Sequence, residues 1–180
     1  AEAYGLPNGE AERIFGIALK QLQEEDSALW RRSELVITTK VFWGGSGVNE
    51  SGLSRKHVRE GLSNSLNRLQ LDYVDMVFCH RPDPHTPTST VVRAMTDAVR
   101  SGMATCWGTS EWSAQQITEA FWIARNEGLE PPQFEQPQYN MLHRDRFENE
   151  YFPMYRAPYN IGTTIWSPLN SGLLTGKYND

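Results

Sequence analysis

The sequence predicts an α/β fold in which helices cover a parallel β-sheet, built either as a small open sheet or as a slice of a (β/α)₈ barrel. Three observations predict it. Strand-like apolar stretches recur about every 30 to 40 residues, helical patterns fill the intervals, and polar side chains stand at the ends of successive strands. The 180 residues suffice for one domain with a hydrophobic core, whereas a closed barrel takes about 250 residues.

The first expected elements are a helix over residues 11–22 and a strand over residues 35–41. The helical pattern gathers apolar residues on one face, namely Ile14, Phe15, Ala18, Leu19 and Leu22. The strand is an apolar and β-branched run, which predicts burial on both of its faces. Alternation puts Val36, Thr38 and Lys40 on one side, with Lys40 at the carboxyl end, where parallel α/β folds place their chemistry.

The remaining elements continue the alternation. Ser54 and Ser113 are predicted N-caps of two further helices. The first of these helices has an apolar face made of Val58, Leu62, Ser65, Leu66 and Leu69. Further strands are expected over 74–80, 104–110, 133–139 and 162–169, and further helices over 91–101, 114–126 and 147–155.

The positions of four polar residues favour the barrel slice over the open sheet. Lys40, His80, Ser110 and Gln136 each lie at or near the end of a predicted strand, on the face that carries alternate residues. Consecutive strands that deliver polar groups at one height are typical of the mouth of a barrel. In a doubly wound sheet, the chemistry would gather at one switch point instead.

Composition limits the classes of function. A net charge of −5 argues against nucleic acid or an anionic membrane surface as the main partner. No apolar stretch reaches the roughly 18 residues that a membrane helix needs, and the first residues lack a signal-peptide pattern, so a cytoplasmic protein is expected. Cys79 and Cys106 fall in predicted buried strands without metal-ligand spacing, and no metal site is predicted.

Three residues from the ends of consecutive units suggest carbonyl chemistry. A phenol is a poor acid at neutral pH, but an adjacent ammonium makes it a stronger one, so Lys40 can activate Tyr4 as a proton donor. The imidazole of His80 can orient a carbonyl oxygen. Singly, each has an ordinary interpretation as a surface aromatic, a solvent-exposed cation or a strand-end histidine. Together they predict a site that protonates a carbonyl oxygen while another group supplies hydride.

Longer motifs are spread over the whole chain. They include Ala-Glu-Ala-Tyr, Leu-Val-Ile-Thr-Thr-Lys-Val-Phe-Trp-Gly-Gly, His-Arg-Pro-Asp-Pro, Trp-Gly-Thr-Ser-Glu-Trp, Glu-Gln-Pro-Gln-Tyr-Asn-Met and Trp-Ser-Pro-Leu-Asn-Ser-Gly-Leu-Leu-Thr-Gly-Lys-Tyr. In this order they resemble the aldo-keto reductase superfamily, and within it the potassium channel β-subunit branch. The resemblance implies a (β/α)₈ barrel that binds NADPH across its mouth and reduces aldehydes or ketones.

The resemblance also implies roles for individual residues. Tyr4 would be the proton donor, Lys40 its activator and His80 the group that orients the carbonyl, while an aspartate that pairs with the lysine would lie two residues before Ala1. The implied cofactor contacts are Ser110 and Gln136 with the nicotinamide carboxamide, Trp166 stacked on the nicotinamide ring, and Ser167, Pro168, Leu169, Ser171 and Lys177 near the pyrophosphate. Trp43 would line the substrate pocket.

By the same resemblance, residues 1–180 form a single domain that is incomplete at both ends. They would hold strands three to seven of the barrel and the end of strand two, without the eighth strand and the contacts to the 2′-phosphate. Histidine at position 80 resembles plant-type members and implies full reductase chemistry. Two alternatives remain: a regulatory cytosolic β subunit, tetrameric when whole, that binds a potassium channel α subunit, or a fragment that is inactive as it stands.

Overall fold

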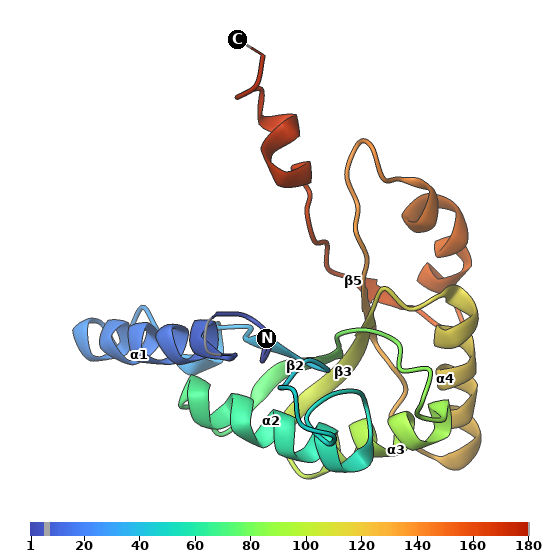
Figure 1. The fold of residues 1–180 in the computed structure, drawn as a ribbon, viewed down its shortest axis with the longest axis horizontal. Coiled ribbons are helices and arrows are strands. Elements are labelled where there is room, and N and C mark those ends of the chain that lie inside the picture. Colours follow the sequence, from blue (N-terminus) through green and yellow to red (C-terminus); the bar gives the residue numbers. More distant parts are fainter. Residues whose placement is uncertain (6–7, 180) are drawn as a thin grey trace.

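The computed structural model describes residues 1–5 and 8–179, in which helices and strands alternate along the chain (Figure 1). The helices are α1 (Glu10–Glu25), η1 (Arg32–Glu34), α2 (Arg55–Leu69), α3 (Thr88–Arg100), α4 (Ala114–Glu127), η2 (Arg146–Glu150), η3 (Phe152–Tyr155) and η4 (Asn170–Thr175). The strands are β1 (Thr38–Val41), β2 (Val74–Cys79), β3 (Ala104–Ser110), β4 (Phe134–Gln136) and β5 (Gly162–Thr163).

All five strands form one parallel sheet in the order β1-β2-β3-β4-β5. One rung of the sheet aligns Lys40, Phe78, Gly108, Phe134 and Gly162. Each strand lies beside the one before it along the chain, as βαβ units wound in one direction require. This confirms the predicted parallel α/β fold and agrees with part of a (β/α)₈ barrel. Within the described residues, β1 and β5 form opposite edges of the sheet and do not pair.

Helices α2, α3 and α4 cover one face of the sheet, and we call the opposite one the open face (Figure 1). On the covered face, Val77 and Trp107 pack with Met95 and Ile117 in the main hydrophobic core. Trp107 is fully buried, and its indole N–H donates a hydrogen bond of 2.8 Å to the carbonyl of Glu130. This packing fixes the strands whose ends carry the polar groups.

Both predicted N-caps, Ser54 and Ser113, are confirmed. The side chain of Ser54 accepts a hydrogen bond from the N–H of His57, and Ser113 forms a capping box with Gln116. The predicted face of α2 is buried along its whole length, at Val58, Leu62, Ser65, Leu66 and Leu69. The apolar spacing of this helix therefore predicted its packing correctly.

The predicted face of α1 is only partly right. Leu19 is buried, but Ile14 is 56% exposed, and the buried stripe also contains Glu12 and Gly16. At Gly16 a Cβ atom would stand 2.6 Å from a backbone oxygen of α2, so the two helices approach closely. Glu12 accepts a hydrogen bond of 2.8 Å from Arg68 of α2. A close backbone approach and a buried ion pair determine this interface, and neither appears in an apolar pattern.

Strand β1 is shorter than predicted and is buried on one face only. Its covered-face residues Thr39 and Val41 are buried, whereas Thr38 is exposed on the open face and Val36, just before the strand, is 70% exposed. The expectation of burial on both faces is wrong, because no element among the described residues covers that side of β1.

The C-terminal part of the chain differs most from the prediction. The helix expected over 147–155 is divided into η2 and η3, and β5 ends at Thr163, after which a parallel bridge joins Gln138 to Trp166. The chain then projects from the sheet as an arm that carries η4 (Figure 1). Across the described residues, none of the helices combines the length and the apolar character needed to cross a bilayer.

Candidate active site

Polar side chains at the carboxyl ends of the strands gather at one edge of the open face. Ser110 of β3 aligns with Gln136 of β4, and His80 directly follows β2 at the same level. Lys40 instead aligns with Phe78, and its Nζ lies 5.6 Å from the centroid of that ring. The expectation that all four groups lie at one height is therefore wrong for Lys40, which the register places one rung lower.

Tyr4 reaches this edge from the N-terminal segment. Its ring stands edge-on to the imidazole of His80, with centroids 5.8 Å apart and an interplanar angle of 84°. The N–H of Glu2 donates a hydrogen bond of 3.4 Å to the carbonyl of Lys40, which ties the segment to β1. Among the described residues no hydrogen bond joins Tyr4 to Lys40. The structure thus brings the phenol to the imidazole, and it leaves the phenol 53% exposed to an incoming molecule.

His80 is a buried, neutral imidazole. It is only 5% exposed, and its Nδ1 atom has no hydrogen-bond partner among the described residues. Burial lowers the pKa of His80 to about 4, and the charges of Arg81 and Lys40 contribute in the same direction. A buried nitrogen without a partner is uncommon, and a neutral ring can hydrogen-bond to an uncharged oxygen.

Arg81 is a functional candidate that the sequence reasoning missed. Its Nη1 donates hydrogen bonds to the carbonyl of His80 and, at 3.3 Å, to Oγ of Ser110. Burial lowers the pKa of Lys40, and the positive charge of Arg81 lowers it further. The sequence feature that could have indicated Arg81 is its position directly after the strand-end histidine, in the motif His-Arg-Pro-Asp-Pro.

Ser110 and Gln136, the predicted carboxamide contacts, form part of one hydrogen-bonded row across the strand ends. The buried hydroxyl of Ser110 donates to the carbonyl of Gln136 at 3.0 Å. The side-chain amide of Gln136 in turn donates to Oγ1 of Thr164 at 2.8 Å. Hydroxyl and amide groups both donate and accept, so this row can exchange an internal hydrogen bond for one to a ligand.

Trp166, the predicted stacking residue, is held by a second residue that sequence reasoning missed. Its indole N–H donates a hydrogen bond of 2.9 Å to Oε1 of Glu111, which follows Ser110 at the end of β3. Arg146 forms an ion pair with the other carboxylate oxygen of Glu111. The available signal was the position of Glu111 immediately after a predicted strand end.

The other predicted cofactor contacts lie in the arm, which points away from the N-terminal segment (Figure 1). Ser167 is half-buried at its base, and the exposed residues are Pro168, Leu169, Ser171 and Lys177. Nζ of Lys177 lies 4.8 Å from the centroid of the neighbouring Tyr178 ring. Trp43, the predicted pocket residue, is 47% exposed, with its ring centroid 4.3 Å from that of Phe42.

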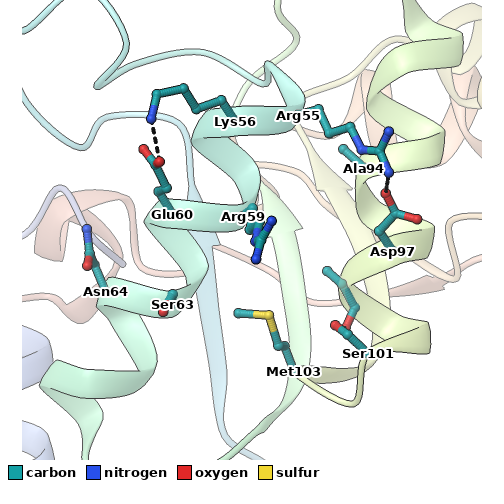
Figure 2. A pocket seen from close by; sticks show the side chains of 11 residues that line it. Arg55, Lys56, Arg59, Glu60, Ser63, Asn64, Ala94, Asp97, Ser101 and Met103 are labelled. Carbon is teal, nitrogen blue, oxygen red and sulfur yellow. Dashed lines mark hydrogen bonds and ion pairs between the residues drawn. The ribbon is translucent and has the colours of Figure 1, made fainter.

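Two pockets lie apart from Tyr4, Lys40 and His80. One, of about 1000 Å³, lies between α2 and α3, where Arg55 forms an ion pair of 2.7 Å with Asp97. Figure 2 shows the side chains that line it. The other, of about 600 Å³, lies beside the loop 141–146. None of the three predicted catalytic residues lines either pocket. Over residues 1–5 and 8–179, no group of three His, Cys, Asp or Glu side chains is placed to hold a metal ion.

Comparison with known proteins agrees with this architecture. Residues 1–180 match the aldo/keto reductase family. The chain is 54% identical over 178 residues to a protein of Oryza sativa subsp. japonica described as "Probable voltage-gated potassium channel subunit beta", covering 99% of this chain and 52% of that protein. An Arabidopsis thaliana protein with the same description is 54% identical over 179 residues, covering 99% of this chain and 52% of that protein.

A Schizosaccharomyces pombe protein, also described as such a subunit, is 52% identical over 182 residues, covering 100% of this chain and 50% of that protein. The chain therefore spans about half the length of the curated relatives it matches. The family match extends over the whole chain, and the βα units follow one another as the resemblance implied. The chain belongs to the aldo/keto reductase family.

Proposed function

We propose that the full-length protein reduces aldehydes or ketones with NADPH, and that Tyr4 donates the proton to the carbonyl oxygen. The observation that carries the proposal is the edge-on contact between Tyr4 and the buried, neutral His80, close to the charge of Lys40, in a chain of the aldo/keto reductase family. NADPH, when bound, supplies a hydride to the carbonyl carbon.

Each of the three residues has a distinct task in this proposal. The neutral imidazole of His80 donates a hydrogen bond to the substrate oxygen and orients it toward the phenol. Tyr4 transfers its proton to that oxygen as negative charge develops there. The ammonium of Lys40 stabilises the phenolate that remains. A small carbonyl compound is the proposed substrate, and Trp43 is proposed to line its pocket.

The residues at the strand ends suit a nicotinamide cofactor. Ser110 and Gln136 offer a hydroxyl and an amide to its carboxamide, and Trp166 offers an aromatic face to its ring. Arg81 supplies a guanidinium, which binds phosphate oxygens well. We propose that Ser167, Pro168, Leu169, Ser171 and Lys177 contact the pyrophosphate.

Steady-state NADPH oxidation by the full-length protein, with a panel of aldehydes and ketones, tests the proposal. Tyr4→Phe should lower kcat by at least about 100-fold, because general acid catalysis commonly contributes that much. Tyr73→Phe is the matched control, since Tyr73 lies outside the site and its ring stacks with Arg32. Full turnover by the Tyr4→Phe variant would contradict the proposed role of Tyr4 as proton donor. We expect residues 1–180 alone to be inactive in the same assay.

A second proposal concerns a partner. The curated relatives at 54% identity carry the description "Probable voltage-gated potassium channel subunit beta", so we propose that the full-length protein binds a channel α subunit as a cytosolic tetramer. Purification of the tagged protein from native membranes, with mass spectrometry of the bound material, tests this. Recovery of a potassium channel α subunit supports the proposal, and its absence from repeated purifications contradicts it.

A further inference from the structure

We propose that Glu111 is a positioning residue of the reductase site, whose carboxylate fixes the indole of Trp166 at the carboxyl ends of β3 and β4. The inference rests on the proposed function, in which Trp166 stacks on the nicotinamide. Glu111 is not proposed to touch the reacting atoms. It acts through Trp166.

The carboxylate of Glu111 joins three separate segments. Its Oε1 accepts a hydrogen bond of 2.9 Å from the indole N–H of Trp166 and another of 2.7 Å from the backbone N–H of Gln138. Its Oε2 forms an ion pair with Arg146 of η2. Trp166 lies 55 residues after Glu111 in the sequence, and Gln138 lies 27 residues after it. One side chain therefore fixes several elements at once.

The backbone of Glu111 is held in an uncommon conformation. Its φ angle is +60°, in the left-handed region that glutamate seldom adopts. Its N–H donates a hydrogen bond of 2.6 Å to the buried carboxylate of Glu135. A conformation of this kind persists where the surroundings determine it, and here it aims the side chain away from β3 toward Trp166.

The indole of Trp166 has a single polar atom, and Glu111 is its partner. Indole N–H is a donor only, so this one hydrogen bond defines how the ring is turned about the side chain. The backbone of Trp166 has hydrogen bonds that do not involve Glu111: its N–H donates to the carbonyl of Pro137, and its carbonyl accepts from the N–H of Tyr139. Removal of the carboxylate should therefore release the ring while the backbone stays in place.

The test measures NADPH binding to the full-length protein by calorimetric titration. Glu111→Ala should weaken binding about tenfold, as the loss of one hydrogen bond to a charged group implies. Glu111→Gln should restore affinity to within about threefold, because its amide oxygen still accepts from the indole. In a Trp166→Phe background, Glu111→Ala should cause a clearly smaller further loss, because phenylalanine has no N–H to hold and only the contacts with Gln138 and Arg146 are removed.

An equal loss of affinity in both backgrounds overturns the inference, since Glu111 would then act without Trp166. A second measurement, by NMR, needs no cofactor. It uses Glu111→Gln and therefore also tests the inference if Glu111→Ala does not fold. The indole N–H proton resonance of Trp166, assigned with Trp166→Phe, should move upfield in Glu111→Gln because a neutral acceptor replaces a carboxylate. An unchanged resonance overturns the inference. If the wild type does not bind NADPH but the resonance of Trp166 still moves in Glu111→Gln, the proposed function is contradicted. The contact between Glu111 and Trp166 then stands.

Discussion

The carboxylate of Glu2 lies 3.2 Å from Nε2 of His57, and both side chains are buried. The same carboxylate accepts a hydrogen bond from the N–H of Phe42, and the backbone of Glu2 donates to the carbonyl of Lys40. One glutamate thus attaches the segment that carries Tyr4 to the strand that carries Lys40.

Loss of the Glu2 carboxylate should destabilise the protein. Glu2→Ala leaves the N–H of Phe42 and the ring of His57 without this acceptor, and we expect the free energy of unfolding to fall by about 2 to 3 kcal/mol. Urea denaturation of the full-length protein measures it. Glu24→Ala, at an exposed position of α1, is the control and should change stability by less than about 0.5 kcal/mol. Equal effects of the two substitutions would contradict the role of Glu2.

The close approach of α1 and α2 predicts an unusual response to alanine. Gly16→Ala improves helix propensity by about 1 kcal/mol, yet its Cβ would stand 2.6 Å from a backbone oxygen of α2. We expect a net loss of about 1 to 2 kcal/mol because the helices must separate. Ala18→Gly, at an exposed position of the same helix, should also destabilise, by about 1 kcal/mol. A more stable Gly16→Ala protein would show that the interface can relax.

Glu135 should make stability depend on pH. Burial raises its pKa to about 7 from an ordinary 4.5, although hydrogen bonds from Thr109 and from the N–H of Glu111 oppose the shift. The folded state therefore holds a proton that the unfolded state releases. Its contribution to stability is complete below about pH 4.5 and is lost as pH rises through about 7.

Glu135→Gln should remove this dependence, since the amide does not titrate. We would measure the free energy of unfolding of the wild type and the variant from about pH 5 to about pH 8. Relative to the variant, the wild type should lose stability as the pH rises. Parallel curves would mean that Glu135 is ionised in the folded protein throughout this range.

His80 should titrate far below an ordinary histidine. Burial and the charges of Arg81 and Lys40 lower its pKa to about 4, so the unfolded state binds the proton more tightly. Its contribution to stability is present above about pH 6.5 and is lost as pH falls toward about 4. NMR titration of the ring protons, assigned with His80→Asn, measures the pKa. In Arg81→Gln the pKa should rise, and an ordinary value in the wild type would contradict the buried imidazole.

Much of the scaffold was predictable from the sequence. A helix that packs on a sheet needs apolar residues at regular helical spacing on one face, and this spacing is visible in the sequence. The face of α2 and the caps at Ser54 and Ser113 are examples, and so is the parallel order of the strands. The face of α1 was not predictable, since Glu12 is buried by its ion pair with Arg68 and Gly16 by a backbone contact.

At the site, the sequence placed Tyr4 and His80 at a shared edge but could not give the register of Lys40. That register depends on which residue of β2 lies opposite Lys40, and alternation along a single strand does not contain this information. Arg81 and Glu111 were missed for another reason. Each lies one residue beyond a predicted strand end, where the direction of the side chain is set by the loop rather than by the pleat.

The sheet order has one further consequence, for exchange of backbone amide hydrogens with solvent. Strands β2, β3 and β4 have a paired neighbour on both sides, whereas β1 and β5, in the described part of the chain, each have one. Protection against deuterium should therefore be greatest in the middle of the sheet and decline toward both margins. For residues 1–180 we therefore expect faster exchange in β1, the strand that carries Lys40, than in β2, the strand that His80 directly follows.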